Sequence, residues 1–221
     1  MREILAFDTS SRWFYVSLLR EESKSLKVVD LTTDKIPRES DDWLHDIIQE
    51  KLALFINDKP DVLAVGQGPG SFTGLRIAYT YARVLGMLWE IPVISFSSIQ
   101  LWKSAFNVQE NDVFIIPANK NLFYVLFPEH KLQTLTKEEL KMTLNQNKQR
   151  AISWEANKKN ILNLQNEFGA DVFKIVEDPQ TDKIKFPFLN LDILDHNKEQ
   201  YKWENALPEY GHEPVFVEKK R

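Results

Sequence analysis

The chain has 221 residues, of which 43% are apolar, and its formal net charge is −4. These values allow one large or two small domains with a substantial core. They exclude a chain-wide basic surface of the kind that binds nucleic acid. No apolar run predicts a membrane span, and the lack of cysteine excludes disulfides and thiolate metal sites. With no export signal at the N-terminus, we expect a cytoplasmic protein.

The first 107 residues predict strands and helices in the order of one mixed α/β sheet. A polar turn at residues 8–11 separates two strands, and a third strand follows, which is typical of an antiparallel meander. The later strands alternate with helices, which favours parallel pairing. This combination indicates a ribonuclease-H-like or actin-like half. The predicted elements are strands 3–8, 12–22, 25–33, 61–66 and 91–97, and helices 41–57 (capped by Ser40 or Asp41), 74–89 and 97–106.

Residues 108–221 predict a smaller, diverged second lobe followed by a weakly structured tail. A hairpin with an Asn-rich turn covers 111–127, a polar helix covers 136–150, and two strands at 151–156 and 171–176 flank a helix at 159–168. No internal repeat is visible at the level of residues.

A glycine-rich loop, VGQGPGSFTGLR at residues 65–76, holds four of the seven glycines. Neither the dinucleotide fingerprint nor the P-loop fits it, because the third glycine and the lysine that those motifs require are missing. An anion site at the N-terminus of the following helix, near Ser71, Thr73 and Arg76, is an alternative. We interpret the loop as a turn from strand to helix, in which glycine permits close backbone approach.

The helix after this loop is apolar over most of its circumference. Ala78, Ala82 and Gly86 form a line of small residues, and a second apolar line lies on a neighbouring side. Such a helix is expected to be covered on two sides. One cover is the sheet; the other is either helix 41–57 or another chain.

Other constellations favour ordinary structural roles. The four histidines His45, His130, His196 and His212 include no pair at metal-ligand spacing on one helix face. The loop also does not match the nucleophile elbow of serine hydrolases. Trp154 and Trp203, with nearby lysines at 158, 159 and 202, offer an alternative of base stacking, although scattered aromatic residues are more often part of a core.

Three segments together resemble the TsaB (YeaZ) family: ILAFDTS at 4–10, DVLAVGQGPGSFTGLRIAYTYARVLG at 61–86 and IPVISFSSIQ at 91–100. The resemblance implies a two-lobe, actin-like (ASKHA) fold and a role in the synthesis of N6-threonylcarbamoyladenosine (t6A) in tRNA. In that family the TsaB-like protein is the non-catalytic scaffold of TsaD, which carries ATP and metal, and the ATPase TsaE also joins. We therefore expect a heterodimer with a TsaD-like subunit, with tRNA contacted indirectly and no metal or cofactor in this chain.

The resemblance places the partner face on helices 41–57 and 74–89. The expected interface residues are Trp43, Leu44, Ile47, Ile48, Ile77, Ala78, Tyr81, Ala82, Val84 and Leu88. The loop that sets the second helix is formed by Gly68, Pro69, Gly70, Ser71, Phe72, Thr73, Gly74 and Arg76. Tyr81→Glu or Ala82→Trp is expected to abolish partner binding in a folded monomer.

Two alternatives belong to other classes. The first is a stand-alone actin-like ATPase or kinase, in which Asp8, Thr9 and Ser10 would contact nucleotide; a local turn is favoured, since the turn lacks glycine. The second is a homodimeric interaction module that uses the same helical face.

Overall fold

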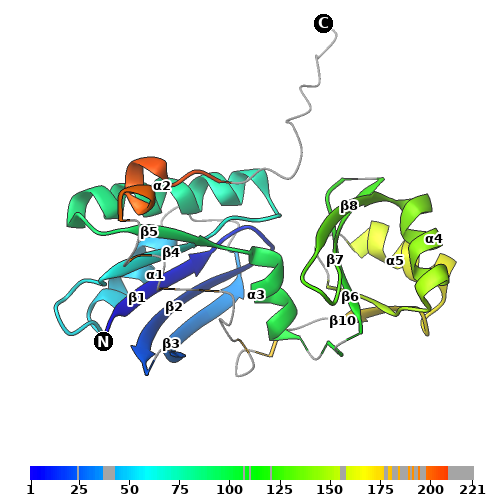
Figure 1. Cartoon of the computed structure of the whole chain (residues 1–221), viewed down its shortest axis with the longest axis horizontal. Coiled ribbons are helices and arrows are strands. Elements are labelled where there is room, and N and C mark those ends of the chain that lie inside the picture. Colours follow the sequence, from blue (N-terminus) through cyan, green and yellow to red (C-terminus); the bar gives the residue numbers. More distant parts are fainter. Residues whose placement is uncertain are drawn as a thin grey trace, which may run out of the picture.

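The chain folds into two α/β lobes that lie side by side (Figure 1) in a computed structural model. The structure describes residues 1–23, 25–36, 43–106, 108–109, 111–119, 121–154, 158–176, 179–180, 184, 189, 191, 194 and 198–208. The expected helix caps Ser40 and Asp41, together with His196 and His212, lie outside these residues.

The first lobe is a five-stranded sheet in the order β3-β2-β1-β4-β5. Strands β1, β2 and β3 pair antiparallel, and β4 and β5 join β1 in parallel, as the sequence predicts. Its elements are β1 (Glu3–Asp8), β2 (Trp13–Glu22), β3 (Ser25–Lys35), α1 (Trp43–Leu52), β4 (Val62–Gly66), α2 (Phe72–Trp89), β5 (Val93–Phe96) and α3 (Ser98–Ala105).

The second lobe repeats this arrangement, with a sheet in the order β10-β9-β6-β7-β8. Strands β6 to β8 form an antiparallel meander, and β9 and β10 are parallel to β6. The second lobe is therefore a structural counterpart of the first, which the residue sequence does not reveal. Its elements are β6 (Val113–Pro117), β7 (Leu122–Leu126), β8 (Leu132–Thr136), α4 (Lys137–Asn147), β9 (Ala151–Trp154), α5 (Lys158–Phe168) and β10 (Phe173–Val176).

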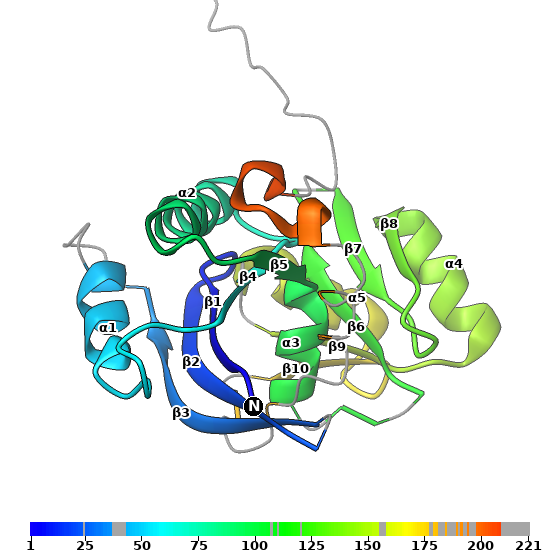
Figure 2. The same cartoon turned by 60° about the vertical axis from the view of Figure 1, so that its left-hand side comes forward.

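Three clusters of buried side chains hold these layers together. One face of the first sheet packs against α1 and α2, which lie on the same side of it (Figure 2). One face of the second sheet packs against α4 and α5. The third cluster spans the lobes, since it joins the other face of the first sheet and α3 to Phe114, Ile152 and Trp154 of the second lobe.

The end of the described chain, part of the segment predicted as a weakly structured tail after the second lobe, returns to the first lobe. Two short 3-10 helices follow, η2 (Lys198–Tyr201) and η3 (Trp203–Asn205), and η3 lies beside α2 (Figures 1 and 2). Ala206 is buried in the same cluster as the inner face of α2. The segment 198–208 therefore belongs spatially to the first lobe.

Candidate interaction face

The glycine loop packs backbone to backbone against the turn after β1. A Cβ on Gly74 would overlap the Thr9 carbonyl oxygen, and a Cβ on Gly70 would overlap the Ser10 carbonyl oxygen. Gly68 has a φ of 100°, a conformation that favours glycine. The glycines are therefore needed for close approach and for the direction of the backbone.

Hydrogen bonds fasten the start of α2 to the same turn. The Ser71 amide donates to the Ser10 carbonyl oxygen at 2.5 Å, and the Thr9 hydroxyl donates to the Gly74 carbonyl oxygen at 2.7 Å. Ser71 also caps the helix, because its Oγ accepts the Gly74 amide. Arg76 lies over the ring of Phe72 at 5.6 Å, so its guanidinium is placed beside the first turn of the helix.

Asp8, Thr9 and Ser10 lie beneath this loop and not in an open site. All three residues are buried, and Asp8 Oδ1 accepts the Ser10 amide at 2.6 Å. Burial raises the pKa of Asp8, while its contacts with Ser10, Ser98 and Trp102 oppose that shift. A side chain that is enclosed by its own backbone cannot reach a nucleotide or Mg²⁺ in this conformation. This enclosed position is in keeping with the local turn that the sequence favours, and contact of these residues with nucleotide stays an untested alternative.

Helix α1 is shorter than predicted, since it ends at Leu52 and not near residue 57. Leu44 and Ile48 lie in the core, and Trp43 packs on Phe14 with ring centroids 4.6 Å apart. The buried Lys51 forms an ion pair with Asp30 and donates to Thr32 of β3. These contacts direct α1 onto β2 and β3.

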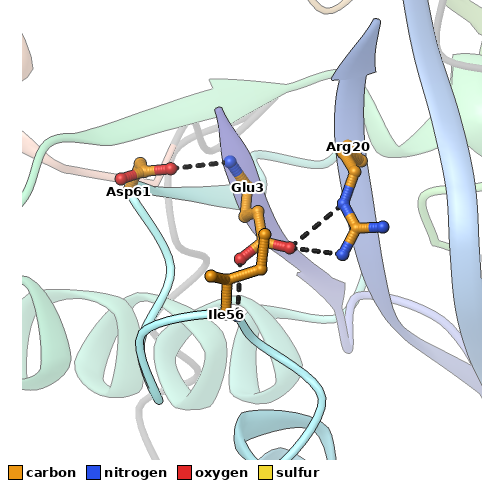
Figure 3. A network of polar contacts seen from close by, with 4 residues as sticks. All are labelled: Glu3, Arg20, Ile56 and Asp61. Carbon is orange, nitrogen blue, oxygen red and sulfur yellow. Dashed lines mark hydrogen bonds and ion pairs between the residues drawn. The ribbon is translucent and has the colours of Figure 1, made fainter. Parts of the chain in front are cut away.

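The loop after α1 is held by a buried glutamate (Figure 3). Glu3 Oε1 accepts two hydrogen bonds from Arg20, and Oε2 accepts the Ile56 amide at 2.8 Å. Asp61 in turn accepts the Glu3 amide. The loop backbone is thereby fixed while the side chains of Leu54 and Ile56 remain exposed.

Helix α2 has a buried inner face and an exposed apolar outer face. Ala78, Ala82 and Gly86 lie on the inner face, where their small size allows close packing on the sheet. The outer face is defined here by Ile77, Val84, Met87 and Leu88, with exposed fractions of 39%, 51%, 52% and 68%, and by the half-buried Tyr81.

Four of the ten expected interface residues are thus core residues, because their stripes face the sheet: Leu44, Ile48, Ala78 and Ala82. Ala82→Trp would overpack the core, so it does not test a surface. Trp43, Ile47 and Tyr81 are half-buried, and Ile77, Val84 and Leu88 are exposed. The sequence prediction omitted Met87, although it lies three residues after Val84 on the same helix side.

Helix α1 does not cover the outer face of α2. Helix α2 packs mainly on β4, β1, β5 and η3, while α1 packs mainly on β2, and the two helices are separated in Figure 2. The outer face of α2 is therefore apolar surface for which the described part of this chain provides no cover, and surface of this kind marks interaction sites.

The remaining candidate groups have structural surroundings. Trp154 is buried against Trp102, with ring centroids 4.5 Å apart, so base stacking by Trp154 is excluded in this conformation; Trp203 packs on α2. Within the described residues, no three His, Cys, Asp or Glu side chains are grouped to hold a metal. No helix in those same residues is long and apolar enough to cross a membrane.

Comparison with known proteins gives a consistent set of relatives. A family model described as TsaD, tRNA N6-adenosine threonylcarbamoyltransferase, matches residues 38–178. A curated protein from Escherichia coli, named tRNA threonylcarbamoyladenosine biosynthesis protein TsaB, is 33% identical over 98 residues, which are 43% of this chain and 40% of that protein. The protein of that name from Buchnera aphidicola is 28% identical over 184 residues, which are 73% of this chain and 80% of that protein.

The chain spans about half the length, or less, of most of these curated relatives. The protein of the same name from Haemophilus influenzae is 34% identical over 127 residues, which are 51% of its length. The solved structure of YeaZ from Pseudomonas aeruginosa superposes over 95% of this chain and 100% of that chain, with a TM-score of 0.63 and 21% identity. This similarity confirms the expected two-lobe, actin-like fold.

Proposed function

The chain belongs to the TsaB (YeaZ) proteins of the threonylcarbamoyltransferase family, and we propose that it supports t6A synthesis in tRNA as the non-catalytic partner of a TsaD-like subunit. The observation that carries the proposal is the uncovered outer face of α2. This face presents Val84, Met87 and Leu88 to solvent on a helix that is anchored at both ends. Burial of these side chains against a second helical surface would stabilise a heterodimer.

The charges around this face indicate the chemistry of the partner. Helix α2 carries Arg76 and Arg83 and no acidic residue. An apolar helical surface with carboxylates at its rim would therefore complement it.

The buried position of Asp8 supports the non-catalytic role. A carboxyl that positions Mg²⁺ must be charged and accessible, whereas burial raises the pKa of Asp8 and the glycine loop encloses it. We assign ATP, metal and transfer chemistry to the TsaD-like subunit. A TsaE-like ATPase would join the pair, tRNA would be contacted indirectly, and the complex would be cytoplasmic.

The test is to mix this chain with the TsaD-like protein of the same organism and to measure mass by light scattering. A heterodimer is expected. Leu88→Glu should weaken it at least about tenfold, because the complex would bury an unpaired charge. The matched control is Met142→Glu on α4. Met142 is also an exposed apolar side chain, and the variant should bind the TsaD-like protein normally.

Two outcomes contradict the proposal. Unchanged binding by Leu88→Glu would show that the outer face is not the interface. A homodimer that Leu88→Glu dissociates, without binding to the TsaD-like protein, would instead favour the homodimeric module.

A further inference from the structure

The segment that follows the second lobe packs on the C-terminal half of α2. We call residues 198–206 the strap. Trp203 is partly buried against the inner cluster of the first lobe, and Ala206 is buried in it. The strap thus connects the end of the described chain to α2, the helix that carries the outer face.

Gly86 is the point where α2 meets both the strap and β5. A Cβ at this position would lie 2.9 Å from Trp203 Cβ and 2.8 Å from Val93 Cγ2. The Gly86 carbonyl oxygen also accepts the amides of Glu90 and Ile91, which end the helix. At Gly86, the inner side of the last turns of α2 therefore packs against both the strap and β5, while the outer face stays exposed.

Beside this contact, the strap borders a cavity. The cavity has a volume of about 670 Å³ and is lined by Arg2, Asp61, Pro92 and Tyr201, among others. Leu191, which precedes the strap in the sequence, is also held to the first lobe: its carbonyl oxygen accepts a hydrogen bond from the Arg2 guanidinium at 3.1 Å. The strap therefore has two apolar anchors: Tyr201 packs against the cluster between the lobes, and Trp203 and Ala206 pack in the cluster that includes the inner face of α2.

We propose that the strap, through Trp203, positions the last turns of α2 for partner binding. This inference rests on the proposed function and extends the partner-binding unit to residues beyond the second lobe. Val84, Met87 and Leu88 lie within two residues of Gly86 along the helix. Without the strap these turns would have to be ordered when the partner binds, and that ordering lowers affinity.

The experiment compares Trp203→Ala and Trp203→Phe with the wild-type chain in two measurements. The first is the Kd for the TsaD-like protein by calorimetry, and the second is amide hydrogen exchange at residues 84–90 in the free chain. Trp203→Ala should weaken binding about tenfold and speed that exchange. Trp203→Phe keeps an aromatic ring on α2. It should therefore retain most of the wild-type affinity and most of the protection of residues 84–90 from exchange.

A truncation elsewhere in the core controls for lost stability. Leu164→Ala removes a buried side chain of the second lobe, away from α2. At a temperature where this variant is folded, its Kd and its exchange at residues 84–90 should match those of the wild type. If Trp203→Ala does not fold, Trp203→Leu serves in its place, with a smaller loss of affinity expected.

Failure of the strap and failure of the proposed function give different results. A Trp203 variant with wild-type affinity overturns the positioning role, as does lost affinity with unchanged exchange, which would place Trp203 in direct contact with the partner. If the wild-type chain forms no complex with the TsaD-like protein, the proposed function is refuted, and the role of the strap in partner binding is refuted with it. Faster exchange in Trp203→Ala would still show that the strap orders α2.

Discussion

Asp8 shows how burial changes the chemistry of a single residue. Its carboxyl is enclosed by the glycine loop, and Asp8 Oδ2, Ser10 Oγ and Trp102 Nε1 make no hydrogen bond to the described residues. Because burial disfavours the charged form, the pKa lies above its ordinary value of 3.8. Asp8 is therefore a cost to stability at neutral pH.

The sign of this effect gives a testable pH dependence. A carboxyl with a raised folded-state pKa binds its proton more tightly in the folded chain, so the free energy of unfolding falls as pH rises from the ordinary pKa to the raised one. Asp8→Asn keeps the oxygen that accepts the Ser10 amide and carries no charge. We predict that its stability relative to the wild type increases as pH rises above the ordinary pKa of 3.8, measured by urea unfolding. A constant difference would contradict the raised pKa, and Asp46→Asn, at an exposed position of α1, is the control.

The residue scale also shows what sequence patterns leave open. Helical spacing groups Ala78 with Ala82 and Val84 with Leu88, but it does not say which group faces the sheet. The structure resolves this through contacts that are distant in sequence, such as Gly74 on Thr9. The need for glycine in the loop could be predicted from its position between strand and helix.

At the scale of elements, the glycine loop sets α2 by close backbone approach. Gly74→Ala would drive a methyl group into the Thr9 carbonyl oxygen, so the loop or the turn must move. We predict a loss of about 3 kcal/mol or more in the free energy of unfolding, measured by urea titration.

A substitution at a second glycine, Gly169, distinguishes the effect of steric crowding from that of backbone strain. Gly169 ends α5 with a φ of 84°, and a Cβ there would meet no atom within 4 Å. Gly169→Ala should therefore cost only about 1 kcal/mol, the strain of a left-handed alanine. Equal losses in the two variants would contradict the close-approach role of the loop.

Elements with a strong periodic pattern could be predicted, and those without one could not. Helix α5 and strands β9 and β10 match the predicted ranges closely. Strand β8 was missed, because its five residues are mostly half-exposed and lead directly into α4 at the Thr136 cap. The strap was missed because 3-10 turns leave no hydrophobic period.

At the scale of the whole molecule, the two lobes share one strand order and one buried cluster. The repeat was invisible in the sequence because packing requires apolar residues at equivalent positions and not the same residues. The cluster between the lobes includes Trp102 and Phe106 of the first lobe, and Phe114 and Trp154 of the second. The ring centroid of Trp154 lies 4.5 Å from that of Trp102 and 5.1 Å from that of Phe106.

This shared cluster predicts that the lobes stabilise each other. Trp154→Ala should cost about 3–5 kcal/mol, because it leaves a cavity where the lobes meet. Amide exchange should then become faster in β1 and β6 alike. Phe173→Ala truncates the separate core of the second lobe and should affect β6 far more than β1. Unchanged protection of β1 in Trp154→Ala would show that the first lobe is stable on its own.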